Sequence, residues 1–146
     1  MDIVKLNLTD VRDKIAAREL SATEVTRAVF KRIEETKQLN TLITLDEENA
    51  LKTAAEIDAK LASGKSVGAL GGVPIIVKDN ISTRGLRTTC ASKFLENYVP
   101  PFDATVVKKL KDAGAVIVGK ANMDEFAMGS ANENSAFGPV LNAADM

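Results

Sequence analysis

The chain has 146 residues, of which 45% are hydrophobic and 27% charged, and its net charge is −1. This balance predicts one folded domain with a buried core, and the near-zero charge gives no global field that would attract nucleic acid or an anionic membrane. No apolar run is long enough for a membrane span, and the N-terminus, MDIVKLNLTDVRDK, lacks the apolar core of a signal peptide. We therefore expect a cytoplasmic protein without a membrane or DNA partner.

The sequence contains no histidine and a single cysteine, Cys90. The absence of histidine excludes Ser-His-Asp and Cys-His catalysis and every histidine-ligated metal site. A single cysteine excludes disulfide frameworks and cysteine-cluster zinc sites. Without a histidine to activate it, Cys90 is better explained as a small half-buried hydrophobic residue than as a nucleophile. We expect no metal site, and we expect a catalytic base in this chain to be a lysine, an aspartate or a glutamate.

Residues 1–62 are predicted to be mainly helical. Thr9 is a candidate N-cap for a short first helix. Ser21 and Glu24 have the spacing of a capping box, in which the hydroxyl and the carboxylate each satisfy a free backbone donor at the start of a second helix. Residues 40–45, NTLITL, form a β-branched run that predicts a short strand.

A third helix is expected after Asp46, which is a candidate N-cap. Its narrow apolar stripe consists of Ala50, Ala54, Ile57 and Leu61. This stripe could face the core of the domain or a partner, and we favour the core. The next segment, residues 63–72, is rich in glycine and serine and predicts a loop, but it has the spacing of neither common phosphate-binding motif.

Residues 73–78, VPIIVK, form an apolar run without polar alternation, which predicts a strand of a parallel sheet with both faces covered by helices. Asp103 is then expected to cap a helix that ends at Gly114, and residues 115–118 predict a second buried strand. The residues of this helix that we expect to face inward are Val106, Val107 and Leu110. Strand, long connection, helix and strand form a β-α-β-like unit and indicate an α/β domain. We also expect a short helix at 123–128.

Two lysines, Lys78 and Lys120, follow these strands. Ligands bind at the carboxyl ends of parallel strands in open α/β sheets, and partial burial favours the neutral amine that a lysine base requires. The simpler interpretation is that each side chain surfaces at the end of its strand, and from position alone we favour it, more strongly for Lys120. Lys78 is distinguished by a flexible glycine pair before its strand and by the polar residues 79–80 after it.

Serine, glycine and amide side chains gather in residues 122–134 and could supply the walls of a pocket. An ordinary polar loop explains the same composition, and on composition alone it is preferred. Asp124 and Glu125 could begin a short helix, where negative charge complements the helix dipole. Adjacent carboxylates point apart on a helix, so they are a poor acid/base pair.

Three motifs in fixed order identify a family. They are GVPIIVKDN at 72–80, TTCASK at 88–93 and GKANMDEFAMGS at 119–130. With these motifs the chain closely resembles the amidase signature family over nearly its whole length, and within the family it is most similar to the A subunits of tRNA-dependent amidotransferases. The resemblance implies N-terminal helices followed by part of an amidase-type mixed sheet flanked by helices. The chain would then be the N-terminal part of a single amidase domain, with a helical region (1–62), a glycine-rich loop (63–72) and an α/β portion (73–146).

The family hydrolyses amides with a Ser-cisSer-Lys triad, in which a lysine acts through a bridging serine on a nucleophilic serine. The resemblance therefore implies that Lys78 is the catalytic base and that Met128, Gly129 and Ser130 line the amide-substrate pocket. The two family serines belong to a Gly/Ser-rich segment beyond the part that matches here, and Ser130 does not match the nucleophile. We therefore expect this chain to be truncated before the catalytic serines and inactive by itself.

In these amidotransferases glutamine is hydrolysed, and the ammonia passes to a partner subunit that amidates ATP-activated glutamate or aspartate on mischarged tRNA. The resemblance implies subunits B and C as partners, mischarged tRNA reached through the complex, and ATP and Mg²⁺ used by the partner. It implies no cofactor bound by this chain. Two alternatives remain open: a stand-alone amidase of the same family, and a non-catalytic fragment that binds the other subunits.

Overall fold

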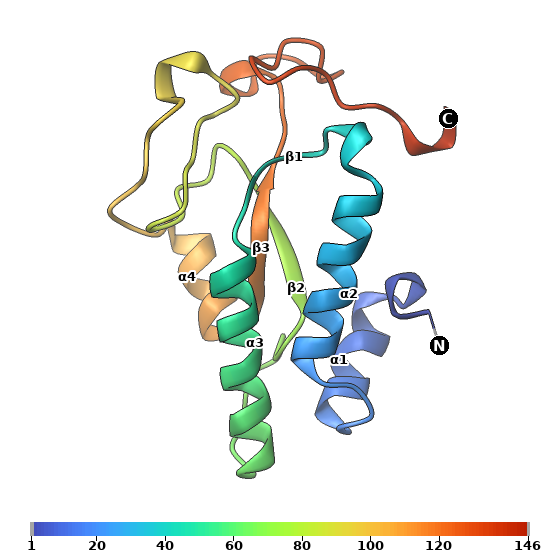
Figure 1. Ribbon diagram of the computed structural model, residues 1–146. Helices are drawn as coiled ribbons and strands as arrows, with labels where there is room; N and C mark the ends of the chain where they lie inside the picture. The colour runs from blue at the N-terminus through green and yellow to red at the C-terminus, as the bar shows by residue number, and fades with distance from the viewer. Residues whose placement is uncertain (1, 146) are drawn as a thin grey trace. The chain divides into compact units, whose positions relative to one another are not determined.

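The structure, a computed structural model, describes residues 2–145, and these residues form a mixed α/β fold, as the sequence predicted (Figure 1). The helices are α1 (Leu8–Ala16), α2 (Ala22–Glu35), α3 (Glu47–Ala62) and α4 (Thr105–Asp112). The strands are β1 (Leu42–Leu45), β2 (Pro74–Lys78) and β3 (Val116–Ala121). Short 3₁₀ turns occur at Ile3–Lys5, Lys37–Leu39, Lys93–Leu95, Glu125–Ala127 and Ala143–Asp145. No helix in this part of the chain is long and apolar enough to cross a bilayer.

The described residues group into two compact units. The first unit comprises the residues up to Glu35 together with Asp46–Ile75 and Lys108–Val118. The second unit comprises Thr36–Leu45, Ile76–Val107 and the residues from Gly119 onward. The chain passes between the units within β2 and within β3, so each unit contains part of both strands.

The three strands form one sheet in the order β1-β3-β2. β1 is antiparallel to β3, with Leu42 opposite Ala121 and Leu45 opposite Gly119. β2 and β3 run in the same direction, because Val116 bonds to Val73 near their starts and Asp79 bonds to Ala121 at their ends. With α4 between β2 and β3 in the chain, the predicted β-α-β unit is confirmed.

The first two helices begin at side-chain caps. Asn7 caps α1 by accepting a hydrogen bond from the Asp10 amide at 2.9 Å, so the prediction of Thr9 as the cap is wrong by two positions. The amide oxygen of Asn7 can reach the third backbone N–H of the helix, which is what an N-cap requires. The capping box at α2 is confirmed: Ser21 Oγ accepts from the Glu24 amide at 3.0 Å, and Glu24 Oε2 accepts from the Ser21 amide at 2.8 Å.

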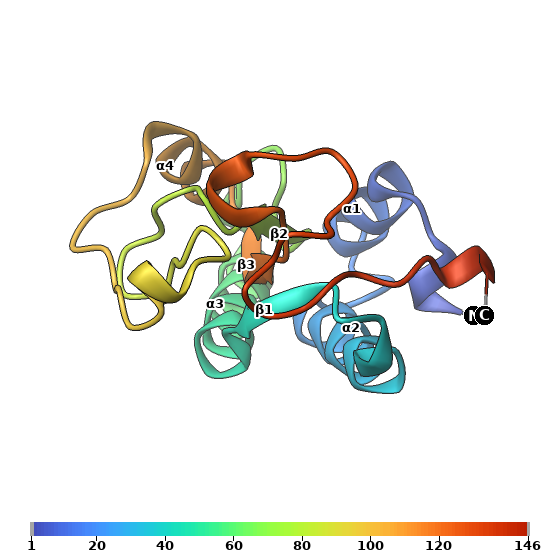
Figure 2. The ribbon, with the colours of Figure 1, turned by 90° about the horizontal axis from the view of Figure 1, so that it is seen from above.

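The apolar stripe of α3 packs into the core of the first unit, as we favoured. Ala50, Ala54 and Ile57 are buried, and Leu61 packs against them at the edge. Figures 1 and 2 show α3 side by side with α2, and the two helices are in contact. The other buried members of this core are Val11, Ile15, Ala22, Val25, Phe30, Val73, Val116 and Val118. The predicted cap of α3 is only half right, because Asp46 occupies the N-cap position but its carboxylate accepts from the Asn49 side chain and not from the helix backbone.

Three predictions for the α/β portion need correction. β2 is not covered on both faces within the described residues, since Ile76 is 47% exposed. In α4 only Val107 is fully buried, while Val106 is 47% exposed, and the helix begins at Thr105. Apolar patterning marks the residues that can be buried, but it does not decide which of them the chain covers. The helix expected at 123–128 is a single 3₁₀ turn, because Phe126 has a left-handed backbone with φ of 50°.

A carboxylate from α3 supports the start of α2 and was not foreseen from the sequence. Asp58 accepts hydrogen bonds from the Ala22 amide at 2.7 Å and from the Thr23 amide at 3.1 Å, and the Thr23 hydroxyl donates to it at 2.6 Å. These are two of the N–H groups that the first turn of a helix leaves without an intrahelical partner. Asp58 therefore fastens α2 to α3 inside the first unit.

We expect Asp58→Ala to lower the free energy of unfolding by about 1–2 kcal/mol, because it removes a charged acceptor from a helix N-terminus. The measurement is urea unfolding followed by circular dichroism, with the midpoint converted through an unchanged slope. Glu56→Ala is the matched control, because Glu56 is an exposed acid on the same helix. Equal midpoints for the two variants would show that Asp58 does not fasten the helices.

Candidate functional site

The carboxyl ends of β2 and β3 carry the two lysines that the sequence distinguished. Lys78, the last residue of β2, is exposed, and its ammonium makes no hydrogen bond or ion pair with the residues that the structure describes. Lys120, in β3, is completely buried. The preferred expectation that Lys120 surfaces at the end of its strand is therefore wrong, and the reason lies in the polar atoms around it.

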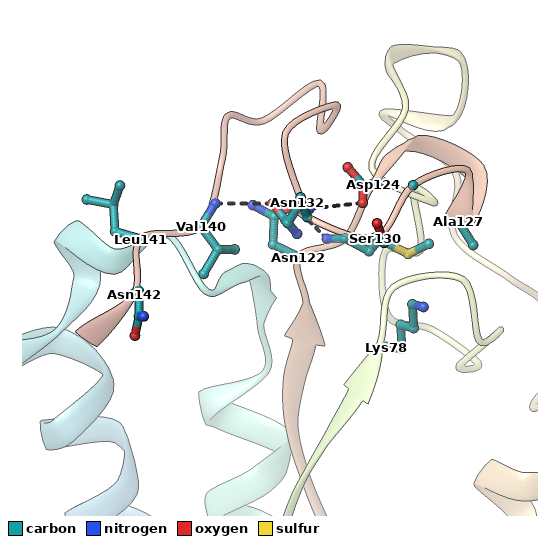
Figure 3. A pocket seen from close by; sticks show the side chains of 12 residues that line it. Lys78, Asn122, Asp124, Ala127, Ser130, Asn132, Val140, Leu141 and Asn142 are labelled. Atoms are coloured by element: carbon teal, nitrogen blue, oxygen red, sulfur yellow. Dashed lines mark hydrogen bonds between the residues drawn. The ribbon is translucent and has the colours of Figure 1, made fainter. Parts of the chain in front are cut away.

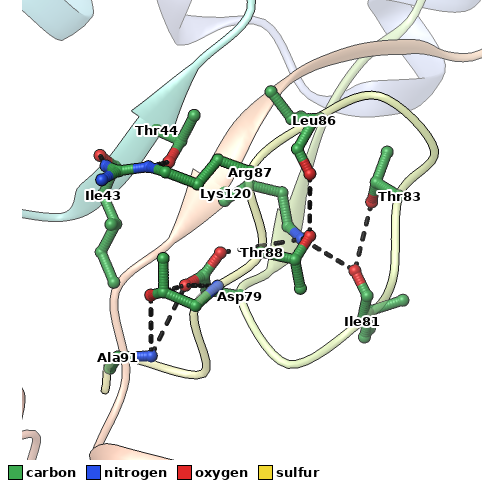
Figure 4. A network of polar contacts seen from close by, with 11 residues as sticks. Ile43, Thr44, Asp79, Ile81, Thr83, Leu86, Arg87, Thr88, Ala91 and Lys120 are labelled. Atoms are coloured by element: carbon green, nitrogen blue, oxygen red, sulfur yellow. Dashed lines mark hydrogen bonds and ion pairs between the residues drawn. The ribbon is translucent and has the colours of Figure 1, made fainter. Parts of the chain in front are cut away.

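The Lys120 ammonium is enclosed by the loop that follows β2 (Figure 4). It donates hydrogen bonds to the Ile81 carbonyl and to Thr88 Oγ1, both at 2.7 Å, and lies 3.7 Å from Asp79 Oδ1. The Thr88 hydroxyl donates onward to the Leu86 carbonyl at 3.0 Å. A buried ammonium is stable only where it is paired and hydrogen-bonded, and this loop supplies those partners.

Asp79 is the charge partner of Lys120. Both side chains are fully buried. Burial lowers the pKa of Lys120 below the usual lysine value, and the neighbouring Asp79 carboxylate opposes that shift. Asp79 Oδ1 accepts no hydrogen bond from the described residues and faces the ammonium instead. Removing either member of the pair would leave an uncompensated charge in the interior.

The other oxygen of Asp79 holds a tight turn at residues 89–91, called here the Asp79 turn. Oδ2 accepts hydrogen bonds from the Thr89 amide at 2.9 Å, from the Thr89 hydroxyl and, more weakly, from the Ala91 amide at 3.5 Å. Cys90 and Ala91 both have left-handed backbones, with φ of 52° and 55°. Such a conformation costs of order 1–3 kcal/mol for a non-glycine residue and persists only where neighbouring groups enforce it.

Cys90 is half-buried in this turn. Burial, together with the nearby Asp79 carboxylate, raises the pKa of the Cys90 thiol. A thiol whose pKa is raised is a poor nucleophile, because the thiolate is the reactive form. These surroundings fit the structural role that the sequence predicted for Cys90.

The Asp79 turn is joined to residues 122–142, called here the pocket loop. The Cys90 carbonyl accepts a hydrogen bond from the Phe126 amide, and the Ala91 carbonyl accepts one from the Ala136 amide, both at 2.9 Å. Figure 2 shows the loop after β2 and the pocket loop next to each other. The left-handed turn thus presents two successive carbonyls to two separate parts of the pocket loop.

A pocket of about 560 Å³ lies between the end of β2 and the pocket loop (Figure 3). Its lining residues are Lys78, Asn122, Met123, Asp124, Ala127, Gly129, Ser130, Ala131, Asn132, Val140, Leu141 and Asn142. All of them belong to the second unit. Except for Lys78, every lining residue comes from the pocket loop, so the geometry of this loop determines the shape of the pocket.

Asp124 organises the part of the pocket loop nearest to Lys78. Its two carboxylate oxygens accept from the Asn132 amide at 2.9 Å and from the Asn134 amide at 3.0 Å, and these backbone hydrogen bonds lower the pKa of Asp124. Local bonds of this kind compete with helix formation, which explains why the helix predicted at 123–128 is absent. Gly129 passes so close to Asp124 that a Cβ atom at Gly129 would lie 2.4 Å from the carboxyl carbon.

The far side of the pocket loop is held by two asparagines. Asn40 Nδ2 donates to the carbonyls of Phe137 at 2.9 Å and of Gly138 at 3.1 Å. Asn122 Nδ2 donates to the carbonyls of Gly138 and Asn40, both at 3.0 Å. Asn40 has a left-handed backbone, with φ of 56°, which asparagine tolerates better than most residues. The two amides hold the loop at Phe137 and Gly138.

Of the predicted site residues, the structure brings Lys78, Gly129 and Ser130 into one pocket. Met128 does not line this pocket, and its side chain is 78% exposed. The amide cluster at 122–134 supplies pocket walls, which is the interpretation that composition alone did not favour. The hydrogen-bond network around Lys120 and the hydrogen bonds from Asn40 to the pocket loop were not predicted from the sequence.

We expect the pocket loop to keep its structure from neutral pH down to about pH 4, because the lowered pKa of Asp124 keeps its carboxylate charged there. A depressed carboxyl pKa contributes stability above the unfolded value of about 3.9, and this contribution is lost as the pH falls through the folded pKa. The amide signals of Asn132 and Asn134, followed by NMR from pH 7 to 2, should shift only below pH 4. Glu125→Gln, an exposed neighbour, should leave that midpoint unchanged, and a midpoint at or above pH 4 would contradict the account.

Among residues 2–145 no group of three or more histidine, cysteine, aspartate or glutamate side chains is placed to hold a metal ion. The polar groups of the pocket are an ammonium, amides, a hydroxyl and a carboxylate whose oxygens are already engaged. Such groups can bind a small polar molecule through hydrogen bonds and a single positive charge.

Comparison with known proteins decides the family. A family model described as Amidase matches residues 24–146. The chain belongs to the amidase family. Among curated proteins, this amidase-family chain is 52% identical to the A subunit of the glutamyl-tRNA(Gln) amidotransferase of Carboxydothermus hydrogenoformans, over 100% of the chain and 30% of that protein. It is 51% identical to the protein of the same name from Acidothermus cellulolyticus, over 99% of the chain and 29% of that protein. The chain thus spans about 30% of the length of the curated relatives it matches.

Solved amidase structures share the fold. A chain of a vestigial protein complex that reveals the evolutionary origins of an s-triazine catabolic enzyme superimposes with a TM-score of 0.92 at 34% identity, covering 96% of this chain and 31% of that one. The native peptide amidase from Stenotrophomonas maltophilia gives 0.84 at 35% identity, covering 93% and 29%. A fatty acid amide hydrolase gives 0.88 at 28% identity, covering 96% and 25%. The predicted amidase-type fold is therefore confirmed.

Proposed function

We propose that this chain supplies the base and one wall of the amide-hydrolysing site of a tRNA-dependent amidotransferase, with glutamine as the amide. One observation carries the proposal. In a chain 52% identical over its full length to the A subunit of a glutamyl-tRNA(Gln) amidotransferase, the unpaired Lys78 ammonium lines the same pocket as Gly129 and Ser130. The pocket volume of about 560 Å³ lies within the range of small-molecule sites.

Lys78 would act as the general base. A lysine accepts a proton only as the neutral amine, and burial is the usual means of favouring that form. Lys78 is exposed among the described residues, so we propose that further residues of a longer polypeptide cover it. The same residues would supply the two serines of the Ser-cisSer-Lys relay that the family resemblance implies.

The pocket loop would bind the amide. Gly129 and Ser130 line the same pocket as Lys78, and there the backbone groups at Gly129 and the Ser130 hydroxyl could donate to or accept from the carboxamide of glutamine. Met128, which the resemblance also implied, does not line this pocket and is left out of the proposed site. Hydrogen-bonding groups held on a fixed loop select an amide over a carboxylate better than apolar contacts do.

The ammonia would pass to a partner subunit. We propose that subunits B and C assemble with the polypeptide that contains this chain, and that ATP, Mg²⁺ and mischarged tRNA bind to the partner side of the complex. No residue of this chain is assigned to a cofactor. We propose a cytoplasmic location, where mischarged tRNA is found.

The test uses a chimeric protein, called here the graft. The 146 residues replace the segment they match in the Carboxydothermus hydrogenoformans protein, which is about 30% of its length. The graft, assembled with its B and C subunits, should release ammonia from glutamine at a rate within about tenfold of the unmodified protein, because a foreign but homologous segment preserves the site and loses only part of its fit. A graft that folds and assembles but releases no ammonia would contradict the proposed function.

The chain by itself is expected to be inactive. A lysine without its serine relay has no proton to accept, and removing members of a unit that acts together leaves little catalysis beyond binding. The purified chain should therefore release ammonia from glutamine no faster than its Lys78→Ala variant. Turnover that Lys78→Ala abolishes would show that the 146 residues contain a complete site.

The alternative of a stand-alone amidase is favoured by the fold match to peptide amidase. In that case the graft would hydrolyse a simple carboxamide without the B and C subunits at the rate seen with them. The other alternative, a non-catalytic fragment, predicts that the chain co-purifies with B and C while Lys78→Ala changes nothing. Dependence on both Lys78 and the B and C subunits would exclude both alternatives.

A further inference from the structure

We propose that Lys120 is a positioning residue for the pocket: through Asp79 it holds the Asp79 turn, and the turn holds the pocket loop. The inference deepens the proposed function, because it concerns the wall of the same amide site. Lys120 does not line the pocket and touches no substrate, so its effect must travel through other residues.

The first step is the pairing of charges. Lys120 reaches from β3 into the loop after β2, where it bonds to the Ile81 carbonyl and to Thr88 Oγ1 and faces Asp79 Oδ1. The ammonium donates two hydrogen bonds, and its contact with Asp79 Oδ1 at 3.7 Å is an ion pair beyond hydrogen-bond distance. Since Asp79 Oδ1 accepts no hydrogen bond among the described residues, the ion pair with Lys120 is the contact that orients this oxygen.

The second step is the strained turn. With Oδ1 facing Lys120, the other oxygen of Asp79 is directed at the Thr89 amide and hydroxyl, and the Asp79 carbonyl accepts from the Cys90 amide at 3.1 Å. Two successive non-glycine residues, Cys90 and Ala91, are thereby kept in the left-handed region. Without these acceptors the residues would relax to ordinary backbone angles, because the left-handed conformation is intrinsically unfavourable for them.

The third step connects the turn to the pocket. The left-handed conformation directs the Cys90 and Ala91 carbonyls at the Phe126 and Ala136 amides. Phe126 lies between the pocket-lining residues Asp124 and Ala127, so a shift of the turn moves the wall opposite Lys78. Residue Asp79 also follows Lys78 directly in the chain, and its amide is anchored to β3 through the Ala121 carbonyl at 3.1 Å. One buried pair therefore fixes both sides of the pocket.

The experiment measures amide hydrogen exchange in the 146-residue chain. Lys120→Met should accelerate exchange of the Phe126 and Ala136 amides at least about tenfold, because local opening of the turn exposes them. Exchange is followed at low urea, where local openings are distinguished from global unfolding by their weak urea dependence. In these local openings the Leu141 amide, which bonds to Leu39 in the same unit, and the Val116 amide, which bonds to Val73 in the first unit, should exchange within about twofold of the parent rate. Lys108→Met, an exposed lysine on α4, is the matched control and should change none of these rates.

Thr88→Val keeps the test decisive if Lys120→Met does not fold. It removes one acceptor of the ammonium with little change in shape, and we expect the same pattern with at least about threefold acceleration at Phe126 and Ala136. Equal acceleration at all four amides, or unchanged rates at Phe126 and Ala136, would overturn the inference, because Lys120 would then only stabilise the fold.

Two further variants separate this inference from the proposed function. Lys78→Met should leave every exchange rate unchanged, since its side chain has no partner in the network. In the graft, Thr88→Val should raise the KM for glutamine more than it lowers kcat, because the pocket wall and not the base is displaced. An inactive graft would count against the proposed function alone, while the exchange pattern would still decide the role of Lys120.

Discussion

Replacing Lys120 by methionine is expected to lower the free energy of unfolding of the chain by about 3–5 kcal/mol. Methionine is one atom shorter than lysine but has a similar volume, so most of the loss comes from charge and not from a cavity. The variant leaves Asp79 fully buried with an oxygen that has lost its only charged neighbour among the described residues. It also leaves the Ile81 carbonyl and the Thr88 hydroxyl without the ammonium as donor.

The measurement is urea unfolding, with the change in midpoint multiplied by the slope. Lys108→Met should stay within about 0.5 kcal/mol of the parent chain, because Lys108 is exposed. The double variant Asp79→Asn/Lys120→Met should recover at least about 1 kcal/mol relative to Lys120→Met, since it removes the buried charge while keeping an oxygen for the Asp79 turn. If the loss of stability in the double variant equals the sum of the losses in the two single variants, the two residues are not coupled.

The features that could be predicted from the sequence depend on residues close together in the chain. The capping box of α2 joins Ser21 and Glu24, three positions apart, and the stripe of α3 follows from helical spacing alone. The β-α-β unit follows from two apolar runs and the helix between them. Lys78 could be selected because a buried strand ends there, and because a motif of a known family includes it.

The features that the sequence did not predict join residues far apart in the chain. Thr88 and Lys120 are 32 positions apart, Thr23 and Asp58 are 35 apart, and Asn40 and the Phe137 carbonyl are 97 apart. Periodicity and capping patterns contain no information about such pairs. Lys120 illustrates the consequence. Its position at the end of a strand predicts a side chain that reaches solvent, but the loop after β2 encloses the ammonium and makes its burial possible.

The pocket loop shows why local propensity failed there. Asp124 and Glu125 favour the start of a helix, yet the Asp124 carboxylate binds amides eight and ten positions further along. A buried carboxylate with backbone donors outweighs the small preference for a helical turn. One feature of the sequence could have indicated this arrangement. Gly129 stands in a polar segment, and a glycine there permits the close approach between its backbone and the Asp124 side chain that the structure shows.

Replacing Lys78 by methionine in the graft is expected to lower kcat for glutamine hydrolysis by at least about 10³-fold. The amine is the only proposed proton acceptor for the serine relay, and methionine fills its volume without accepting a proton. The KM should change little, because the pocket loop and not Lys78 supplies most of the lining. Lys65→Met, an exposed lysine in the glycine-rich loop, is the matched control and should leave kcat unchanged.

Lys78→Arg distinguishes a base from a fixed positive charge. Arginine keeps the charge but stays protonated at any accessible pH, so it cannot accept the serine proton. If Lys78 served only to attract or orient the substrate, the arginine variant would retain most of the activity. If Lys78 is the base, Lys78→Arg should be as inactive as Lys78→Met.

The most direct measurement is therefore glutamine-dependent ammonia release by the assembled graft, compared between Lys78, Lys78→Met and Lys78→Arg at equal concentrations of folded protein. The account predicts that both variants lose at least about 10³-fold in kcat while the Lys65→Met control does not. Retention of kcat within about tenfold by either Lys78 variant would contradict the assignment of Lys78 as the base.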